Sequence, residues 1–353
     1  MLSFGKKKVP ILGVDVSSTS VKVLEFSKIK DGYRLESYAV EPLPANAVTD
    51  KTIQDVEAVG ESLRRAVKKS GTRAKHAALA VAGSSAITKK INMPANLSDD
   101  EMETQIQLEA DQYIPYPLDE VSLDFEVLGE VKGAPESVEV LLAASRTENV
   151  ATRTAVAELA GLIPKFVDVE PYTIENAYAL ITDQIPDYGV DKTTAVIDIG
   201  ATMTSLNVIE DGKLIYTREQ PFGGKQLTEE IMRRYGLSYE DAGRVKKEGG
   251  LPENYEPEVL TPFKQTMAQQ VGRFLQFFYS SSEHEHVDYI ALAGGCASIP
   301  GVAELVESNL GIAAGVANPF SSVKLTSRIA KQRIAGDAPS LMIASGLALR
   351  GVI

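Results

Sequence analysis

Two aspartates in this sequence each stand at the end of an apolar run and are followed by small or hydroxyl-bearing residues. Asp15 ends the run at 12–14 and precedes a turn that contains Ser17, Ser18, Thr19 and Ser20. Such a turn lines up backbone N–H groups and hydroxyls around an anion, and the carboxylate can hold a hydrated Mg²⁺. Asp and Ser also favour ordinary turns because they bond to the local backbone. The first stretch by itself leaves both interpretations open.

A second copy of this pattern occurs at residues 194–209. When Asp198 is aligned with Asp15, the apolar strand, the small residue two positions later and the threonine four positions later all recur. The turn of the second copy contains Gly200, Ala201, Thr202 and Met203. Asp211-Gly212 then predicts a hairpin into a third strand, as in the first copy. Because internal repetition rarely arises by chance, the sequence predicts two copies of one phosphate-binding sheet.

Alternation and helical spacing predict the elements around the first copy. We expect strands at 33–40 and 77–82, and a helix at 53–69 that stops at Gly71. The stretch 84–161 has a different texture, with predicted strands at 86–93, 121–127 and 138–142, a helix that begins at the capping box of Ser98 and Glu101, and a helix at 148–160. We therefore expect a small module of sheet and helix inserted into the first domain.

Helices and a glycine pair follow the second copy. Helices are predicted at 226–235, 238–246 and 262–279, and the aromatic stripe of the last one is expected in the core. A buried strand leads to Gly294 and Gly295, which allow a flat ligand to approach the backbone. The predicted domains are 1–188, in which 84–161 is inserted between 1–83 and 162–188, then 189–336, and finally a C-terminal helix at 337–353 that returns to the first domain.

Composition bounds the class of protein. The 353 residues suffice for two domains, and 44% hydrophobic with 24% charged residues is typical of a soluble globular protein. A net charge of −12 argues against a nucleic-acid partner. Cys296 is the single cysteine, which excludes an internal disulfide. No apolar run is long enough to span a bilayer, and we expect a cytoplasmic protein whose lysines at 6–8 form a solvated basic tip.

Several stretches taken together resemble a known superfamily. The two aspartate turns, the Gly294-Gly295 step after a strand and the closing helix of small residues follow the order found in the actin, Hsp70 and sugar-kinase superfamily. The inserted module resembles the SHS2-type subdomain of the cell-division protein FtsA. Four stretches resemble the PilM family of type IV pilus assembly proteins, namely 112–117, 198–204, 222–231 and 317–320. The resemblance implies an α/β fold of the actin-like (ribonuclease H-like duplicated) ATPase type with an inserted SHS2-type α+β subdomain.

The resemblance also implies ATP or ADP between the two domains, with at most weak ATPase activity. The turns at 17–20 and 200–203 would surround the phosphates, and Asp15 and Asp198 would hold Mg²⁺ through water. Gly294 and Gly295 would lie against the nucleoside, opposite a wall that contains Gly223, Gly224, Lys225 and Glu229. Glu170 stands where related ATPases place a catalytic carboxylate near the attacking water. It equally suits a turn-capping role before Pro171.

For partners, the resemblance implies binding of the N-terminal cytoplasmic peptide of the membrane protein PilN beside the inserted module. Through PilN it implies contact with the PilN/PilO membrane complex at the cytoplasmic face of the inner membrane, and a role in pilus biogenesis and twitching motility. Contact with the pilus motor ATPases and self-association are implied too. Tyr113, Ile114 and Tyr116, set among prolines, are candidates for the walls of the peptide groove. They equally suit packing of the module onto the core.

Two other classes of function share this fold. A sugar or acid kinase needs a general base and a polar sugar pocket, and we find no further Asp-Gly or His-bearing loop after the first turn that offers them. His76 is interpreted as structural, and His284 and His286 lack a third ligand for a metal. An FtsA-like membrane-associated filament protein is expected to continue into an amphipathic helix after the closing helix. We therefore prefer the pilus assembly interpretation.

Overall fold

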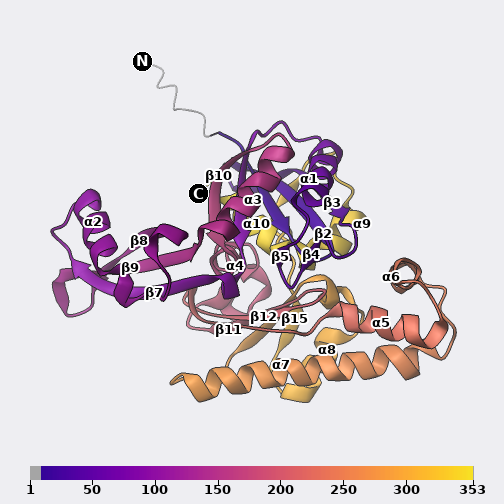
Figure 1. Ribbon diagram of the computed structural model, residues 1–353. Coiled ribbons are helices and arrows are strands. Elements are labelled where there is room, and N and C mark those ends of the chain that lie inside the picture. The colour runs from indigo at the N-terminus through magenta and orange to yellow at the C-terminus, as the bar shows by residue number, and fades with distance from the viewer. Residues whose placement is uncertain (1–8, 353) are drawn as a thin grey trace.

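The computed structural model describes residues 9–352 and shows two lobes with a smaller module at one side (Figure 1). The predicted basic tip at 6–8 lies outside the described residues. Within residues 9–352, no helix has the length and apolar character needed to cross a membrane. The end of the chain returns to its beginning, since Gly351 packs on Ile11.

The first lobe is built on a six-stranded sheet with the order β10-β6-β1-β2-β3-β16. Its strands are β1 (Ile11–Val16), β2 (Ser20–Ile29), β3 (Gly32–Pro42), β6 (His76–Val81), β10 (Ile163–Val169) and β16 (Lys324–Leu325). β1 pairs antiparallel with β2 and parallel with β6. On one face, α1 (Val56–Ser70) and α3 (Thr147–Leu159) bury the apolar side chains of the sheet. As predicted, α1 ends at Gly71, which adopts a left-handed conformation.

The second lobe repeats this pairing in a five-stranded sheet with the order β13-β12-β11-β14-β15. Its strands are β11 (Thr193–Ile199), β12 (Thr204–Glu210), β13 (Lys213–Gln220), β14 (Tyr289–Ala293) and β15 (Ala314–Val316). β11 is antiparallel to β12 and parallel to β14, just as β1 is to β2 and β6. Its outer face is covered by α5 (Gly224–Tyr235), α7 (Thr261–Ser281) and α8 (Val302–Leu310), and α6 (Tyr239–Glu248) packs on α5. The predicted duplication is therefore present, and the aromatic stripe of α7 is core.

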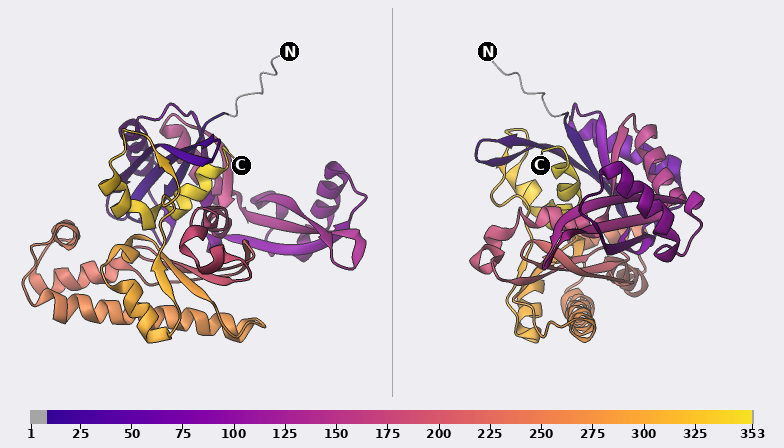
Figure 2. Two further views of the ribbon diagram at one scale, coloured as in Figure 1. Left: turned by 180° about the vertical axis from the view of Figure 1, so that it is seen from behind. Right: turned by 90° about the vertical axis from the view of Figure 1, so that its left-hand side faces the viewer.

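Two helices, α4 (Glu170–Tyr178) and α10 (Met342–Leu349, in yellow), lie between the two sheets (Figure 2). A side chain at Gly346 would overlap the carbonyl oxygen of Thr173, and one at Gly13 would overlap that of Ala344. Small residues therefore let α10 pack directly on α4 and on β1. The sequence-based expectation of a tightly packed closing helix is met in this way.

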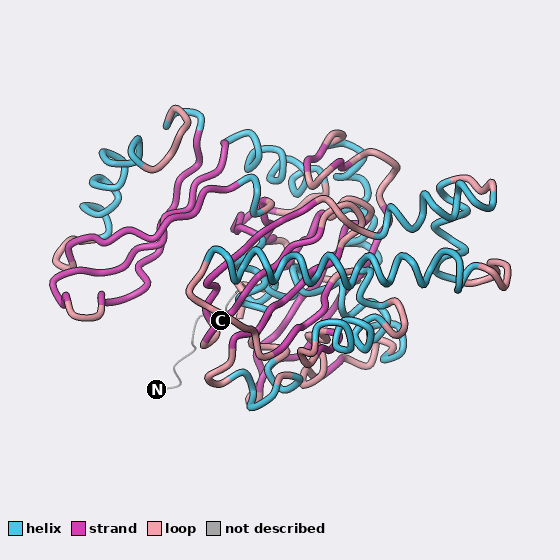
Figure 3. The backbone as a smooth tube through the Cα atoms, turned by 90° about the horizontal axis from the view of Figure 1, so that it is seen from below, coloured by secondary structure: helices cyan, strands magenta, loops and turns pink. Residues whose placement is uncertain are grey.

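The inserted module is a three-stranded sheet, β7-β9-β8, with α2 packed on it. Its elements are β7 (Ala86–Pro94), α2 (Asp99–Glu109), β8 (Val121–Val131) and β9 (Ala134–Arg146). The predicted capping box of Ser98 and Glu101 is present at the start of α2. The module projects to the side of the two lobes (Figure 3). It joins the first lobe through the 3-10 turn η1 (Gly83–Ser85) and through α3.

The chain returns to the first lobe earlier than the predicted residue 337. β16 pairs with β3, and Phe320 and Val323 pack against the buried side chains of β2 and β3. The short helix α9 (Lys331–Asp337) adds Ile334 to the same cluster. A two-residue strand and a seven-residue helix carry too little periodicity to be found by pattern. This return depends on burial against the sheet, which the sequence does not display.

Candidate functional site

Asp15 is the second-last residue of β1, a strand that is buried along its whole length. Its side chain is 3% exposed. Lys22 Nζ lies 2.7 Å from Asp15 Oδ2, and the Ser17 hydroxyl donates to the same oxygen at 3.0 Å. β2 runs back along β1 and places Lys22 directly opposite Asp15. Our sequence patterns did not point to Lys22, although a lysine between two valines just after the turn is a signal that can reveal it.

Asp198 has the equivalent place at the end of β11, beside the glycine pair that follows β14. Gly294 has a left-handed φ of 84°, and a side chain there would lie 2.6 Å from Asp198 Oδ1, so only glycine fits. Burial raises the pKa of Asp198 to about 6, and the charges of four nearby residues also act on it, namely Lys22, Lys51, Asp15 and Glu170. The two predicted aspartates therefore lie close together in one cluster of charged residues where the two lobes meet.

The two predicted turns touch where the two lobes meet. The hydroxyls of Ser18 and Thr202 lie 3.0 Å apart and share a hydrogen bond. Within the first turn the Ser17 N–H donates to the Ser20 carbonyl at 3.0 Å, and the Thr19 carbonyl accepts from the loop after β3. The two turns are therefore in direct hydrogen-bond contact across the junction of the two lobes.

The second turn rests on the start of α5. The Gly200 N–H donates to the Met203 carbonyl at 2.9 Å, and the Gly200 carbonyl accepts from the Gly224 N–H at 3.0 Å. A side chain at Gly223 would lie 2.5 Å from the carbonyl oxygens of Gly200 and Ala201. The structure thus brings the predicted residues of the turn and of the helix start into direct contact.

The side chains of the two predicted adenosine residues lie on the surface of α5, although the Lys225 N–H donates to the Ala201 carbonyl of the second turn at 2.8 Å. Lys225 Nζ is 3.9 Å from Glu229 Oε1, and both side chains are about half exposed. They pair with each other on the helix surface. On the opposite wall, Gly295 begins a short 3-10 turn, and no described atom lies within 4 Å of the position that its side chain would take.

A second set of charges lies near the two aspartates. Lys51 comes from the turn between β4 (Val48–Thr49) and β5 (Thr52–Ile53). Its Nζ lies 2.5 Å from Glu170 Oε2 and 2.9 Å from Glu219 Oε1, and the three side chains are 16%, 9% and 7% exposed. The Arg153 guanidinium donates to the Lys51 carbonyl at 2.9 Å. No pattern in the sequence indicates this cluster, because Lys51 is 119 and 168 positions away from its two carboxylates.

Burial and pairing oppose each other in this cluster. Burial raises the pKa of Glu170 in spite of the neighbouring Lys51. Burial also tends to raise the pKa of Glu219, but interactions with Lys51 and Ser84 outweigh burial and hold that pKa below its ordinary value. Burial tends to lower the pKa of Lys51, but the two carboxylates outweigh this effect and raise it. The lysine therefore stays charged at neutral pH.

The donor set at the ends of β1 and β11 suits a magnesium ion. Mg²⁺ prefers oxygen ligands, and it usually keeps several waters beside one or two carboxylates and substrate phosphates. Asp15 and Asp198 supply two carboxylates from opposite lobes, and the hydroxyls of Ser18 and Thr202 lie at the same junction. Among the described residues, no group of three or more metal-binding side chains occurs.

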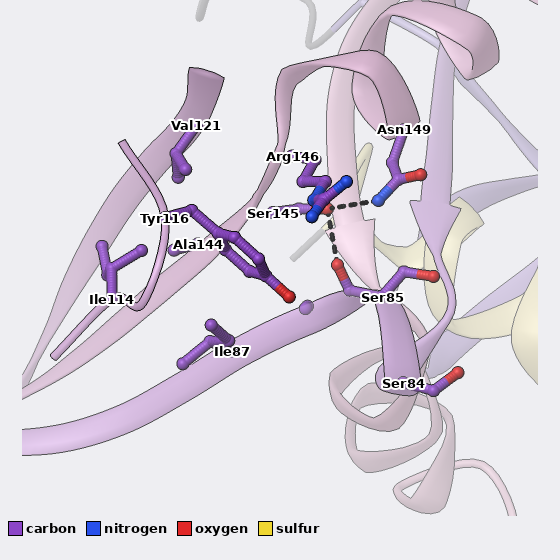
Figure 4. Close-up of a pocket in the computed structure, with 11 residues that line it drawn as sticks. Ser84, Ser85, Ile87, Ile114, Tyr116, Val121, Ala144, Ser145, Arg146 and Asn149 are labelled. Carbon is purple, nitrogen blue, oxygen red and sulfur yellow. Dashed lines mark hydrogen bonds between the residues drawn. The ribbon is translucent and has the colours of Figure 1, made fainter. Parts of the chain in front are cut away.

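A separate pocket of about 200 Å³ lies where the inserted module joins the first lobe (Figure 4). One side is apolar and the other is polar, with Ile87, Ile114 and Tyr116 facing Ser85, Ser145 and Asn149. The Ser145 hydroxyl donates to the Ser85 carbonyl at 2.7 Å, and the Asn149 amide donates to Ser145 at 3.3 Å. The pocket therefore offers an apolar surface next to bonded polar groups.

Two of the three residues predicted for a peptide groove line this pocket. Ile114 is buried, while Tyr116 is 37% exposed and lies under the guanidinium of Arg146, 4.5 Å from its ring centroid. Tyr113 instead packs on the core of the module, with Leu123 beside it. For Tyr113 the structure shows packing within the module.

Comparison with known proteins identifies several relatives. A family model described as type IV pilus assembly protein PilM matches residues 13–352. The solved structure of a PilM-PilN type IV pilus biogenesis complex matches with a TM-score of 0.81 and 28% identity, covering 98% of this chain and 99% of that chain. Cell division protein FtsA of Bacillus subtilis (strain 168) is 26% identical over 352 residues, which cover 87% of this chain and 78% of FtsA. MreB5 of Spiroplasma citri bound to ADP shares the fold, with a TM-score of 0.50, 14% identity and coverage of 96% and 95%.

The duplicated sheets, the paired aspartate turns and these likenesses define a protein of the actin-like ATPase fold. Within that class, the chain belongs to the family of the type IV pilus assembly protein PilM. The fold and family expected from the sequence are confirmed. The match to PilM over nearly the whole chain supports a role in pilus assembly over a sugar kinase or an FtsA-like filament protein.

Proposed function

We propose that this chain binds ATP or ADP between its lobes and the cytoplasmic N-terminal peptide of PilN in the pocket beside its inserted module. The observation that carries the first part is the contact between two aspartate-bearing turns, one from each lobe, at Ser18 and Thr202. A chain of phosphates requires donors and metal-holding carboxylates at close range, and the two turns supply both. The ADP complex of MreB5 gives an example of nucleotide binding by a protein of this fold.

In this proposal the turns hold the phosphates. The N–H groups and hydroxyls of residues 17–20 and 200–203 donate to phosphate oxygens. The ammonium group of Lys22, which donates to both Asp15 and Ser17, adds a positive charge. Mg²⁺, bound through water to Asp15 and Asp198, would neutralise charge on the phosphates.

The walls of the cleft would hold the nucleoside. The glycine pair Gly294-Gly295 would lie against it, because glycine permits close approach of the backbone. The exposed Lys225 and Glu229 on α5, beyond the helix start at 223–224, would reach the adenosine from the opposite side. The side chains of these two residues form an exposed ion pair on the helix surface, so they can turn toward a ligand at low cost.

Glu170 is the residue that we propose to orient the attacking water. It begins α4 and lies near Asp15 and Asp198, where the lobes meet. Its carboxylate is held by Lys51 at 2.5 Å, which opposes a role as an independent general base. We therefore expect ATP binding with at most weak hydrolysis.

The PilN part of the proposal comes from the relative that forms the PilM-PilN complex, which is 28% identical and is covered almost completely. The pocket suits an extended peptide, because the apolar wall of Ile114 and Tyr116 faces polar groups that can bond a backbone. Through PilN the chain would join the PilN/PilO complex at the cytoplasmic face of the inner membrane. Contact with the pilus motor ATPases and self-association belong to the same proposal.

Calorimetric titration of MgATP into wild type and Asp198→Ala tests the nucleotide site. We expect the variant to lose at least about tenfold in affinity, which corresponds to about 1.4 kcal/mol. Asp119→Ala, which removes an exposed aspartate of the inserted module, is the matched control and should bind like wild type. Unchanged affinity of Asp198→Ala in magnesium would show that the metal is not held as proposed.

Titration with a synthetic peptide of the cytoplasmic N-terminus of the cognate PilN tests the partner. We expect saturable binding at micromolar peptide, and a scrambled peptide of the same composition should not bind. Absence of binding at high micromolar concentrations would count against this chain as a PilN receptor.

A further inference from the structure

The sheet of the first lobe has an edge that faces away from the second lobe. At the carboxyl end of β1, the turn that follows it contacts the second lobe through Ser18 and Thr202. At the other end, β1, β6 and β10 begin side by side, because His76 is in register with both Ile11 and Ile163. Figure 1 shows the chain entering the first lobe at this end, on the side away from the second lobe.

Three large apolar side chains are exposed where these strands begin. Val9, just before β1, is 55% exposed, and Ile163, the first residue of β10, is 56% exposed. Leu159, the last residue of α3, is 52% exposed and precedes the short turn into β10. One exposed apolar side chain needs no explanation, whereas three at the same end of one sheet indicate a surface that another body covers.

Basic side chains surround these apolar ones. Lys75 directly precedes β6, where its carbonyl accepts from the N–H of the first residue of β10, and Arg73 lies two residues before it. Lys165 is exposed on β10 itself. Because β2 runs antiparallel to β1, the hairpin between β2 and β3 turns at the same end and adds Lys28 and Lys30. We call the surface formed by these five basic residues and the three apolar ones the basic edge.

The basic side chains of this edge are exposed and unpaired, unlike others on the first lobe. Arg34, Arg65 and Lys69 each lie 3.1 Å or less from a glutamate oxygen. Among the described residues, no carboxylate lies within 4.0 Å of any of the five basic groups of the edge. Their charges are therefore available to a partner.

The charge of this edge is opposite to that of the chain as a whole. Lysines at 6–8 directly precede the first described residue, so the sequence adds three basic residues to the five of the edge. Two exposed acidic residues, Asp31 and Glu158, lie at the same end of the lobe. The whole chain has a net charge of −12. A local excess of positive charge on an acidic protein indicates an anionic partner.

An anionic phospholipid surface fits both properties of the basic edge. Lysine and arginine side chains are attracted to anionic headgroups, and apolar side chains enter the boundary between headgroups and acyl chains. The first eight residues have the same mixed character, since Leu2 and Phe4 precede the three lysines. An acidic protein or a nucleic acid would be held by the charges alone and would leave the apolar side chains without a role.

We propose that the basic edge binds the surface of an anionic phospholipid bilayer directly. Val9, Leu159 and Ile163 would lie at the level of the headgroups, with the basic side chains on the lipid phosphates and the lysines at 6–8 adding their charge. The second lobe and the aspartate turns would then lie on the side away from the bilayer. This binding requires neither nucleotide nor PilN, and so goes beyond the proposed function.

Co-sedimentation of the full chain with lipid vesicles, without nucleotide or partner, tests the proposal. We expect binding to vesicles of phosphatidylglycerol and phosphatidylcholine in equal parts, and at least about tenfold weaker binding to phosphatidylcholine alone. Binding to the anionic vesicles should weaken as the salt concentration rises. Equal binding to both kinds of vesicle, or no binding to the anionic ones at low salt, would overturn the proposal.

Charge reversal locates the surface. The double variant Lys75→Glu with Lys165→Glu should bind anionic vesicles at least about tenfold more weakly, since each basic residue near such a surface contributes about fivefold. The matched control is Lys247→Glu with Arg273→Glu, because both residues are exposed on helices of the second lobe and the net charge changes by the same amount. The control should bind like wild type. Equal losses in the two double variants would show that affinity follows net charge, and would overturn the assignment to this edge.

Two further variants separate the apolar part and the basic tip. Ile163→Ser should weaken binding at least about threefold, whereas Val190→Ser, 63% exposed in the loop before β11, should leave it unchanged. Unchanged binding of Ile163→Ser would show that charge alone is recognised, as by an acidic protein, and would overturn the membrane as the partner. If glutamines at 6–8 abolish binding while the reversal at Lys75 and Lys165 has no effect, the folded edge has no role and the proposal fails.

Discussion

Replacement of Lys51 by methionine should lower the free energy of unfolding by about 3–5 kcal/mol at pH 7.5, the range for removing one partner of a buried ion pair. The buried range applies because the side chains of Glu170 and Glu219 are 9% and 7% exposed and their distances to Nζ are 2.5 and 2.9 Å. An exposed pair would contribute only about 0–1 kcal/mol. Methionine has a volume similar to that of lysine, so the loss of stability measures the contribution of the lysine's charge and hydrogen bonds.

The loss should depend on pH in a defined direction. The pKa of Lys51 is raised, so its stabilising effect is fully present below its ordinary pKa and is lost only as the pH rises through the folded value. In the variant, two buried carboxylates lose their lysine partner, and protonation of the carboxylates relieves this loss as the pH falls. The difference between wild type and Lys51→Met should therefore be larger at pH 7.5 than at pH 5.

Urea unfolding followed by far-ultraviolet circular dichroism measures the effect, since the chain has no tryptophan. Lys213→Met is the matched control, because Lys213 is 74% exposed and pairs with Glu175 at 3.6 Å, so it should cost less than about 1 kcal/mol. Adding Glu170→Gln to Lys51→Met should restore part of the stability. A loss below about 1 kcal/mol at pH 7.5, or an equal loss at both pH values, would refute the reasoning.

Three further predictions concern packing, the pocket and a helix cap. Gly346→Ala should lower the free energy of unfolding by about 1–3 kcal/mol, because the added methyl overpacks α10 on α4. Gly243→Ala on α6, where the added methyl meets open space, should instead raise it by up to about 1 kcal/mol. Similar urea midpoints for the two variants would contradict this prediction. Tyr116→Ala should weaken binding of the PilN peptide at least about tenfold, as measured by calorimetry. Tyr188 lies outside the pocket and is 71% exposed, so Tyr188→Ala should leave the affinity unchanged. Equal effects of the two substitutions would show that the peptide binds elsewhere. Ser98→Ala removes the N-cap of α2, so it should lower the free energy of unfolding by about 1 kcal/mol and speed amide hydrogen exchange in that helix. Unaltered exchange in α2 would argue against the cap.

Local patterns were sufficient for most of the scaffold. The strands of both copies, the capping box of Ser98 and Glu101 and the stop of α1 at Gly71 were predicted because alternation, caps and left-handed glycines depend on residues only a few positions apart. The equivalence of Asp15 and Asp198 in the two copies also followed from the sequence, since an internal repeat can be seen by aligning a chain with itself.

Contacts between distant segments were not available from these patterns. The early return of the chain at β16 was missed because a short strand at the edge of a sheet carries no periodic signal. Tyr113, Ile114 and Tyr116 were predicted as one group, yet only Ile114 and Tyr116 line the pocket. Tyr113 packs on the core of the module instead.

By itself, the sequence determined that two aspartate turns of one design occur in a duplicated fold with an inserted module, and it determined the family. These properties are written in local spacing and in the repeat. Only the tertiary structure decided that Lys22 faces Asp15, that Ser18 meets Thr202, and that Lys51 joins carboxylates from both lobes beside the pocket. The physical reason is that the partners of Lys51 are 119 and 168 positions away, and burial brings them together when the lobes pack.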